Sequence, residues 1–154
     1  GDVRHLNLHG ALSNMGCVDA VMARTCFEAA LVVAPDIIIM GFAATKMEDV
    51  CRDLGCRWAG EIFADRAYNA DGTLVDRRLP GAMIHDPNEA AANMVAMVKA
   101  GAILTGDGQR LDTRIDTICV HGDSAEAVNL SRAVRDGLET AGIAVSAFEG
   151  SPLG

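Results

Sequence analysis

The chain has 154 residues, 50% of them hydrophobic and only 4% aromatic, and carries a formal net charge of −8 at pH 7. These values fit one globular domain over residues 1–154 with an aliphatic core, and an acidic chain with few stacking side chains is a poor match for nucleic acid. No apolar run reaches the roughly 18 residues that a membrane span needs, so we expect no membrane partner.

The first third of the chain predicts a strand, a loop, a helix and a second strand. Residues 3–8 alternate weakly in polarity and predict the first strand, and residues 9–18 are expected to form a loop. Asp19 is placed to cap a helix that runs to about Val33. The β-branched run at residues 37–41 predicts a strand that is buried on both faces.

The middle of the chain predicts a short helix, a third strand and a long connection. Thr45 caps the helix, and Gly55 lies where a left-handed backbone commonly ends one. The apolar run at residues 57–63 predicts the strand. Residues 65–85 then form a connection of a length that is typical of functional loops in compact domains.

The last third continues the alternation of helices and strands. Residues 86–89 (Asp-Pro-Asn-Glu) predict a helix start, and that helix ends at about Gly101. A Gly-Asp-Gly turn within residues 103–114 predicts a small excursion or a hairpin. Residues 117–120 predict a fourth strand.

A final helix and strand complete the expected fold. The helix is capped by Asp123 or Ser124 and runs to about Ala141, and residues 143–148 predict a fifth strand. Strands that alternate with helices in this order are parallel and are joined by right-handed crossovers. The expected fold class is therefore α/β, built from parallel β/α units.

The cysteines indicate the cellular compartment in which the protein works. Their number, five, is odd, and the chain has no Cys-x-x-Cys pair. Free thiols in a reducing cytoplasm explain this best. The N-terminus also lacks the basic and apolar regions of a signal peptide, so we expect a cytoplasmic protein.

Parallel α/β sheets and barrels bind ligands at the carboxyl ends of their strands, and polar side chains follow several of the predicted strands. These candidates are His9 and Asn14 after the first strand, Glu61, Asp65, Arg66 and Tyr68 at the third, and His121 and Asp123 after the fourth. Histidine can transfer protons near neutral pH, a carboxylate can orient it, and arginine can hold a substrate carboxylate. The expected chemistry is proton transfer and polarisation of a carbonyl group.

Some of these residues also have purely structural interpretations. Glu61 in an apolar strand needs a partner, for which a salt bridge to Arg66 or Lys46 is available. Asp123 can serve as the cap of the last helix alone, and the two histidines can be ordinary loop residues. The spacing of histidines and carboxylates specifies no metal site, and the chain has no glycine-rich nucleotide loop of its own.

Three stretches together resemble a known family. HGALSN (9–14), EIFADRAYNADGTLVDRRLPGAMIHDP (61–87) and DTICVHGDS (116–124) are similar to the LamB/YcsF family, the A subunit of bacterial 5-oxoprolinase. The resemblance implies an irregular (β/α) barrel similar to those of sugar hydrolases and deacetylases. It also implies ATP-dependent opening of the 5-oxoproline lactam to glutamate, in partnership with B and C subunits.

The resemblance agrees with the strand-end argument on six residues. These are His9, Glu61, Asp65, Arg66, His121 and Asp123. We hypothesise that Arg66 holds the carboxylate of 5-oxoproline and that one of the two histidines moves protons while Asp65 or Asp123 orients it. Tyr68 and Asn14 are expected to contact the substrate.

The chain departs from the family pattern in two ways. It covers only about the second half of the pattern, and five strands of this type leave two sheet edges open. The family's Lys-Pro-His-Gly-Ala-Leu-Tyr reads Asn-Leu-His-Gly-Ala-Leu-Ser here, so Asn7 replaces a cation and Ser13 replaces a tyrosine hydroxyl.

These departures keep other interpretations open. The first is a non-catalytic or degenerate half-barrel that binds a partner, a second copy of itself or a small ligand. The second, by analogy of fold alone, is a metal-dependent deacetylase-like hydrolase.

Overall fold

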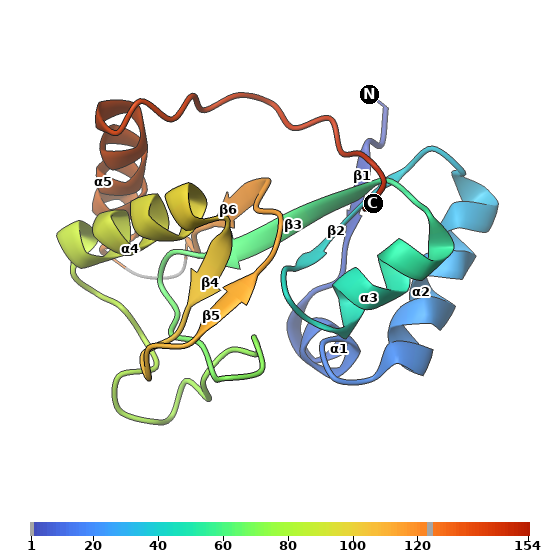
Figure 1. Ribbon diagram of the computed structural model, residues 1–154, viewed down its shortest axis with the longest axis horizontal. Coiled ribbons are helices and arrows are strands. Elements are labelled where there is room, and N and C mark those ends of the chain that lie inside the picture. Colours follow the sequence, from blue (N-terminus) through green and yellow to red (C-terminus); the bar gives the residue numbers. More distant parts are fainter. Residues whose placement is uncertain (1, 123–124) are drawn as a thin grey trace.

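The computed structural model describes residues 2–122 and 125–154, and its central element is a parallel sheet (Figure 1). The strands are β1 (His5–Asn7), β2 (Ile38–Phe42), β3 (Trp58–Phe63) and β6 (Thr117–Cys119), hydrogen-bonded in the order β1-β2-β3-β6. Phe42, Glu61 and Thr117 are neighbours across the sheet. The predicted arrangement of parallel strands is confirmed.

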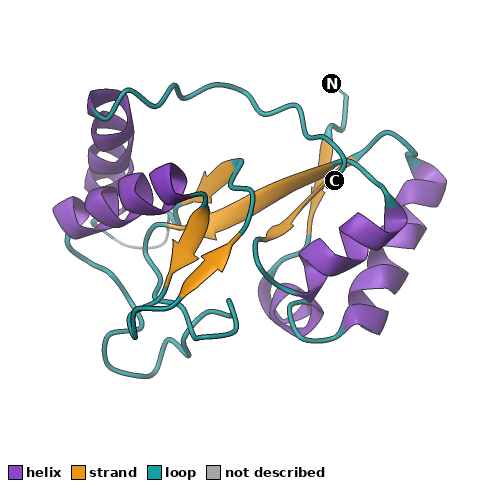
Figure 2. Cartoon of the chain, viewed as in Figure 1, coloured by secondary structure: helices purple, strands orange, loops and turns teal. Residues whose placement is uncertain are grey.

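Helices lie beside both ends of this sheet (Figure 2). They are α1 (Gly10–Gly16), α2 (Ala20–Val33), α3 (Lys46–Leu54), α4 (Pro87–Ala100) and α5 (Ala127–Thr140). The first three group near β1 and β2, and α4 packs against α5 near β6. The short strands β4 (Ala102–Leu104) and β5 (Arg110–Asp112) form the predicted hairpin. None of the helices described here is both long and apolar enough to cross a bilayer.

Local sequence signals set most helix ends. The side chains of Asp19, Thr45 and Asp86 accept hydrogen bonds from backbone N–H groups in the first turns of α2, α3 and α4. Gly55 and Gly101 end α3 and α4 with φ of 61° and 60°, the left-handed region that glycine adopts without strain. These predicted ends are confirmed. The cap residues predicted for α5, at positions 123 and 124, lie outside the described residues.

Residues 9–18, which we expected to form a loop, contain α1. The Ser13 hydroxyl donates to the carbonyl of Gly10 at 2.8 Å, and Leu8 and Cys17 at the two flanks are buried. A seven-residue helix is too short to be stable alone. Packing against α2 supplies the stabilisation that the short helix lacks by itself. The local sequence pattern therefore did not predict the helix.

The two faces of the sheet are covered differently. Trp58 and Ile62 belong to the main core cluster, which also contains buried side chains of α3 and α4. On the other face, Met40 belongs to a small cluster of buried residues, and of the described partly buried hydrophobic residues Phe148, near the end of the chain, packs against it. We call this second face the open face. Because side chains alternate along a strand, Glu61 also lies on it.

The fifth strand predicted at residues 143–148 is wrong. This segment crosses the open face as an extended connection and does not pair with the outer edge of β6 (Figure 1). Phe148 packs edge-on against His5 with ring centroids 5.6 Å apart, and Ser151 then bridges to Trp58 in antiparallel fashion. These contacts near the amino ends of the strands hold the segment away from β6.

The sheet has two open edges. β1 and β6 are its end strands, and neither outer edge pairs with another strand among residues 2–122 and 125–154. This matches the expectation that the chain forms part of a barrel without closing it. Unpaired edges present free backbone donors and acceptors, which favour association with further strands.

Candidate active site at the carboxyl ends of the strands

Polar side chains gather where β3 and β6 end. Asp65 and Arg66 follow β3 closely, and His121 follows β6. The two strands are parallel neighbours, with Phe63 opposite Cys119, so the chain leaves them side by side. The structure therefore brings three residues predicted from sequence to one end of the sheet.

The central contact of the site joins His121 and Asp65. Nδ1 of His121 lies 2.7 Å from Oδ2 of Asp65. The imidazole stacks on Phe63 with centroids 5.8 Å apart and an interplanar angle of 16°, and Phe63 packs edge-on against Phe42. A carboxylate at Nδ1 makes that nitrogen the N–H donor and leaves Nε2 to exchange protons. An imidazole that is oriented in this way can act as a general base.

Asp65 keeps one carboxylate oxygen uncommitted. The side chain is buried, and Oδ1 has no hydrogen-bond partner among residues 2–122 and 125–154. A buried acceptor without a donor is costly by about 1–3 kcal/mol. A ligand that brought a donor to this oxygen would remove that cost.

Glu61 is the second buried carboxylate of the site. Both of its oxygens lie 3.2 Å from the amide nitrogen of Asn7, across β2. Burial raises the pKa of Glu61, and the hydrogen bond from Asn7 and the nearby histidines, His9 and His121 foremost, offset part of that rise. The carboxyl also borders a cavity of about 770 Å³ on the open face.

The salt bridge that we considered for Glu61 is not formed within the described part of the chain. Lys46 pairs with Asp49 at 3.0 Å, and Arg66 donates to the carbonyl of Val75 at 2.7 Å. The neutral amide of Asn7 takes the place of either cation. Glu61 is therefore a buried carboxyl whose side-chain partner, among the described residues, is a neutral amide.

Arg66 fastens the segment that follows it. Its guanidinium is buried, Nη2 donates to the carbonyl of Val75, and Nε is buried without a partner among the described residues. Burial lowers the pKa of Arg66. Its role in holding a substrate carboxylate stays a prediction, and the unpaired Nε is a donor that such a carboxylate would satisfy.

The 65–85 connection folds back onto the site. Tyr68 is buried, its hydroxyl accepts a hydrogen bond of 2.7 Å from the amide of Phe63, and burial raises its pKa. Gly72 has φ of 82°, and a Cβ there would lie 2.6 Å from the carbonyl oxygen of Ala44. Both contacts hold the connection against the carboxyl ends of β2 and β3. Contact of Tyr68 with substrate stays a prediction.

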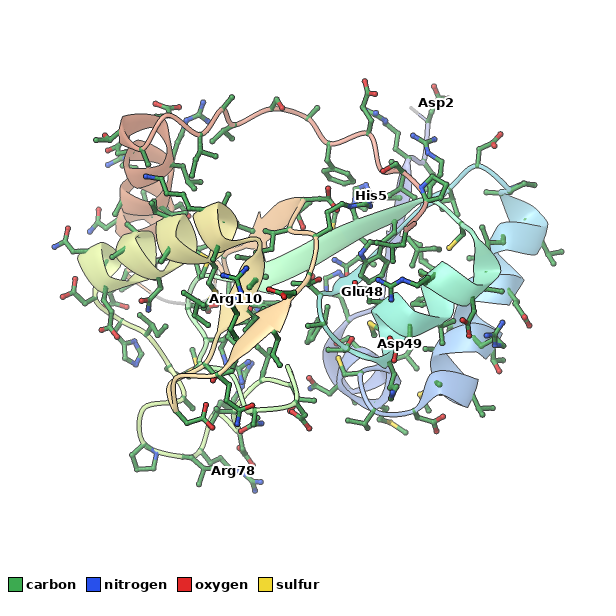
Figure 3. The ribbon with its side chains drawn as sticks, in the orientation of Figure 1. Asp2, His5, Glu48, Asp49, Arg78 and Arg110 are labelled. Atoms are coloured by element: carbon green, nitrogen blue, oxygen red, sulfur yellow. The ribbon has the colours of Figure 1, made fainter. Side chains whose placement is uncertain are left out.

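The remaining candidates lie further out or cannot be placed. His9 is exposed just before α1, and Asn14 is exposed on that helix. Asp123 lies outside the described residues. At the tip of the 65–85 connection, Arg78 pairs with Asp76 and points away from the sheet (Figure 3).

Two residues of the site were not among the predicted ones. Asn7 holds Glu61, and Cys119 lies opposite Phe63 on the neighbouring strand. Burial raises the pKa of the Cys119 thiol to about 12, with the negative charges of Glu61 and Asp65 adding to the effect, so it stays protonated near neutral pH. The signal for Asn7 was its polarity within a predicted strand, but its partner follows only from the register.

Metal ligation is a separate question. Within residues 2–122 and 125–154, no group of three or more His, Cys, Asp or Glu side chains is placed to hold a metal ion. His121 and Asp65 bond to one another.

Known sequences and structures place the chain in a family. The sequence pattern of the LamB/YcsF family matches residues 1–152. The chain belongs to the LamB/YcsF family. Relatives named as the A subunit of 5-oxoprolinase include that of Ruegeria pomeroyi, 62% identical over 96% of this chain and 58% of that protein. The protein of that name from Gluconobacter oxydans is 49% identical over 94% of this chain and 57% of its own length.

A solved structure has the same fold. The lactam utilization protein from Thermus thermophilus superposes with a TM-score of 0.82 and 37% sequence identity, covering 94% of this chain and 57% of that one. The expected α/β class and partial barrel are thus confirmed. This LamB/YcsF chain spans somewhat more than half the length of the relatives it matches.

Proposed function

We propose that the chain is a component of a 5-oxoprolinase, corresponding to its A subunit, and takes part in opening the lactam ring of 5-oxoproline to give L-glutamate. A lactam substrate is supported by the names of the similar proteins. Two are named as the A subunit of 5-oxoprolinase, and the solved structure is named as a lactam utilization protein. The observation that carries the proposal is the pair of His121 and Asp65 at the carboxyl ends of β6 and β3.

Ring opening requires proton transfers at two places. A water molecule adds to the lactam carbonyl and loses a proton, the C–N bond breaks, and the departing nitrogen gains a proton. His121 is suited to the first step because Asp65 fixes its Nδ1 proton and leaves Nε2 free. Glu61 is suited to the second, because burial raises its pKa and favours the protonated acid.

Arg66 is the proposed anchor for the substrate carboxylate. Its buried Nε has no partner among the described residues, and a carboxylate is the acceptor that matches a guanidinium best. We also propose that exposed Asn14 and buried Tyr68 contact the substrate. Neither has an unpartnered buried polar atom like that of Arg66 to support the assignment.

ATP belongs to the proposed reaction, and we propose no residue of this chain as its ligand. Two of the cations pair with carboxylates, Lys46 with Asp49 and Arg78 with Asp76. The first turn of α3 is capped by Thr45, and the nearby amide of Ala44 donates to Glu48. We therefore assign no step of ATP use to this chain.

The proposal includes partner chains. The names of the relatives imply an assembly of several subunits, and we propose the B and C subunits of 5-oxoprolinase as partners, with self-association through the open sheet edges as a second mode. Five free thiols favour a cytoplasmic location for this assembly.

A second candidate function is a non-catalytic half-barrel that binds a partner or small ligand. One observation favours it. Ser13, where the family usually has tyrosine, is buried and donates to the carbonyl of Gly10 within its own helix, so it offers no hydroxyl at the site.

The two candidates separate in one assay. Glutamate release would be followed from 5-oxoproline and ATP by the chain alone and with candidate B and C subunits. The matched control substrate is 2-pyrrolidinone, which has the same ring without the carboxylate, and its opening is followed as release of 4-aminobutyrate. Release from 5-oxoproline only, with partners present, supports the enzyme. No release under any combination, with the complex assembled, supports the binding half-barrel.

A further inference from the structure

The side-chain amide of Asn7 has two hydrogen-bond partners, the carboxyl of Glu61 and the sulfur of Met40. Its amide nitrogen lies 3.2 Å from Oε1 and 3.2 Å from Oε2 of the carboxyl, and 3.0 Å from the sulfur of Met40. Met40 lies on β2 between the two side chains. The contact thus crosses three strands of the open face and fixes both oxygens of a carboxyl that is only 7% exposed.

Among the described residues, no Lys or Arg acts on the pKa of Glu61, and Arg135, which lines the same cavity, pairs with Glu139 at 2.9 Å. Around β1 the groups that act on it are His5 and His9, and after β6 the group is His121. Negative or neutral titratable groups on the same side are Asp65, Tyr68 and Cys119. The residue at position 7 is therefore the nearest place where a fixed charge could control this carboxyl.

We propose that Asn7 is a positioning residue that holds Glu61 in place and, because it carries no charge, allows that carboxyl to keep its proton for donation to the departing lactam nitrogen. The proposal rests on the proposed function for the donation step. The hydrogen bond and its effect on Glu61 do not depend on any activity.

The amide has two opposing consequences for Glu61. A donor that binds both oxygens favours the ionised carboxylate, so it lowers the pKa of Glu61, while burial raises that pKa by a larger amount. Removing the donor therefore raises the pKa of Glu61 further. Replacing the amide with an ammonium group lowers it, because an opposite charge within 4–6 Å lowers a carboxyl pKa by about 1–3 pH units.

The first test measures this ordering without any substrate. The wild-type chain, Asn7→Leu and Asn7→Lys would be labelled with ¹³C-glutamate and titrated by NMR, with Glu61→Gln identifying the Glu61 resonance. Leucine has nearly the shape of asparagine, so Asn7→Leu should fold even where Asn7→Lys does not. We expect the midpoint for Glu61 to be highest in Asn7→Leu, lower in wild type and lowest in Asn7→Lys, by about one pH unit or more. An unchanged midpoint in the folded variants would overturn the proposal.

The second test reads the donation step in the assembled enzyme. An acid that must be protonated makes activity fall as pH rises through its pKa. The alkaline limb of kcat for 5-oxoproline should therefore move to lower pH in Asn7→Lys and to higher pH in Asn7→Leu. A parallel loss at every pH would show a merely structural role and would contradict the proposal.

The two tests fail in distinguishable ways. If Glu61 titrates in the expected order but no assembly releases glutamate, the proposed function fails and the positioning of Glu61 by Asn7 stands. If glutamate is released but the titration midpoint of Glu61 is the same in wild type and in the variants at position 7, the proposed function stands and the assignment of Asn7 fails.

Discussion

Arg66 and Arg114 occupy opposite ends of the sheet and have contrasting hydrogen bonds. Arg114, near the amino ends of the strands, donates to the side chain of Asp116, to the carbonyl of Trp58, and to both the hydroxyl and the carbonyl of Ser151. Arg66, at the carboxyl ends, donates to the carbonyl of Val75, and its buried Nε has no partner among the described residues.

The difference separates a structural region from a candidate site. At the amino ends, arginine side chains fasten the end of the chain to the sheet, and Arg57 adds a hydrogen bond to the carbonyl of Glu149. At the carboxyl ends, Asp65 and Arg66 each keep a buried polar atom without a partner among the described residues, and Trp58 and Thr117 at the starts of β3 and β6 do so as well. Asp65 and Arg66 are the charged members of this set and are adjacent in the chain, and a ligand that supplied a donor and an acceptor would satisfy both of them.

The largest expected effect is loss of activity on removing the general base. His121→Asn keeps a side chain of similar polarity but cannot exchange a proton, so kcat for glutamate release should fall at least about 100-fold. His85→Asn is the matched control, because His85 is an exposed histidine outside the site. Equal activity of the two variants would remove His121 from the proposed chemistry.

At the other end of the sheet the expected effect is on stability. Arg114→Met removes the hydrogen bonds to the end of the chain and should lower the free energy of unfolding by about 2 kcal/mol, with little change in kcat. Denaturant unfolding measures the difference. Arg135→Met, which removes an exposed pair with Glu139 on α5, should cost about 0.5 kcal/mol or less. If the free energy of unfolding falls by the same amount in both variants, the hydrogen bonds of Arg114 do not stabilise the fold.

Arg66→Lys tests the anchor proposed for the substrate carboxylate. Lysine keeps the charge but loses the planar fork, so KM for 5-oxoproline should rise about tenfold while the fold persists. Arg77→Lys, an exposed neighbour on the same connection, is the control and should leave KM unchanged. A KM that does not respond to Arg66→Lys would sink this assignment.

The smallest expected effect concerns the pH dependence of stability. The pKa of Glu61 is raised in the folded chain, so the folded state binds this proton more tightly than the unfolded state does, and stability declines as pH rises towards the raised pKa. Glu61→Gln removes this term and should gain stability over wild type with rising pH, while the two agree at low pH. Exposed Glu28→Gln should show no such trend. A pH-independent difference for Glu61→Gln would contradict the raised pKa.

Much of the fold could be predicted because its signals are local. Helix caps such as Asp19, Asp86 and Gly101 depend on a few neighbouring residues. The run of β-branched residues in β2 predicts a buried strand without reference to any other part of the chain. The helix α1 and the path of residues 143–148 depend on contacts with distant parts of the chain. Phe148 packs against β2 and Ser151 bridges to Trp58, and no local pattern encodes those partners.

The residues of the candidate site also fall into those that local sequence predicts and those that depend on distant contacts. Asp65 and His121 could be found because each follows a predicted strand, and parallel strands bring such residues together. The partner of Glu61 could not be found, because Asn7 reaches it across β2 and only the register of three strands reveals the contact. Charge pairing favoured a cation for Glu61, and the structure supplies a neutral amide.

The central claim is that the carboxyl ends of β3 and β6 hold the lactam. The most direct measurement is an NMR titration of the chain with 5-oxoproline that follows the imidazole resonances of His121 and His85. We expect a saturable shift of the His121 resonances that needs about tenfold more 5-oxoproline in Arg66→Lys, while those of His85 stay constant. No shift at His121, or equal shifts at both histidines, would contradict it.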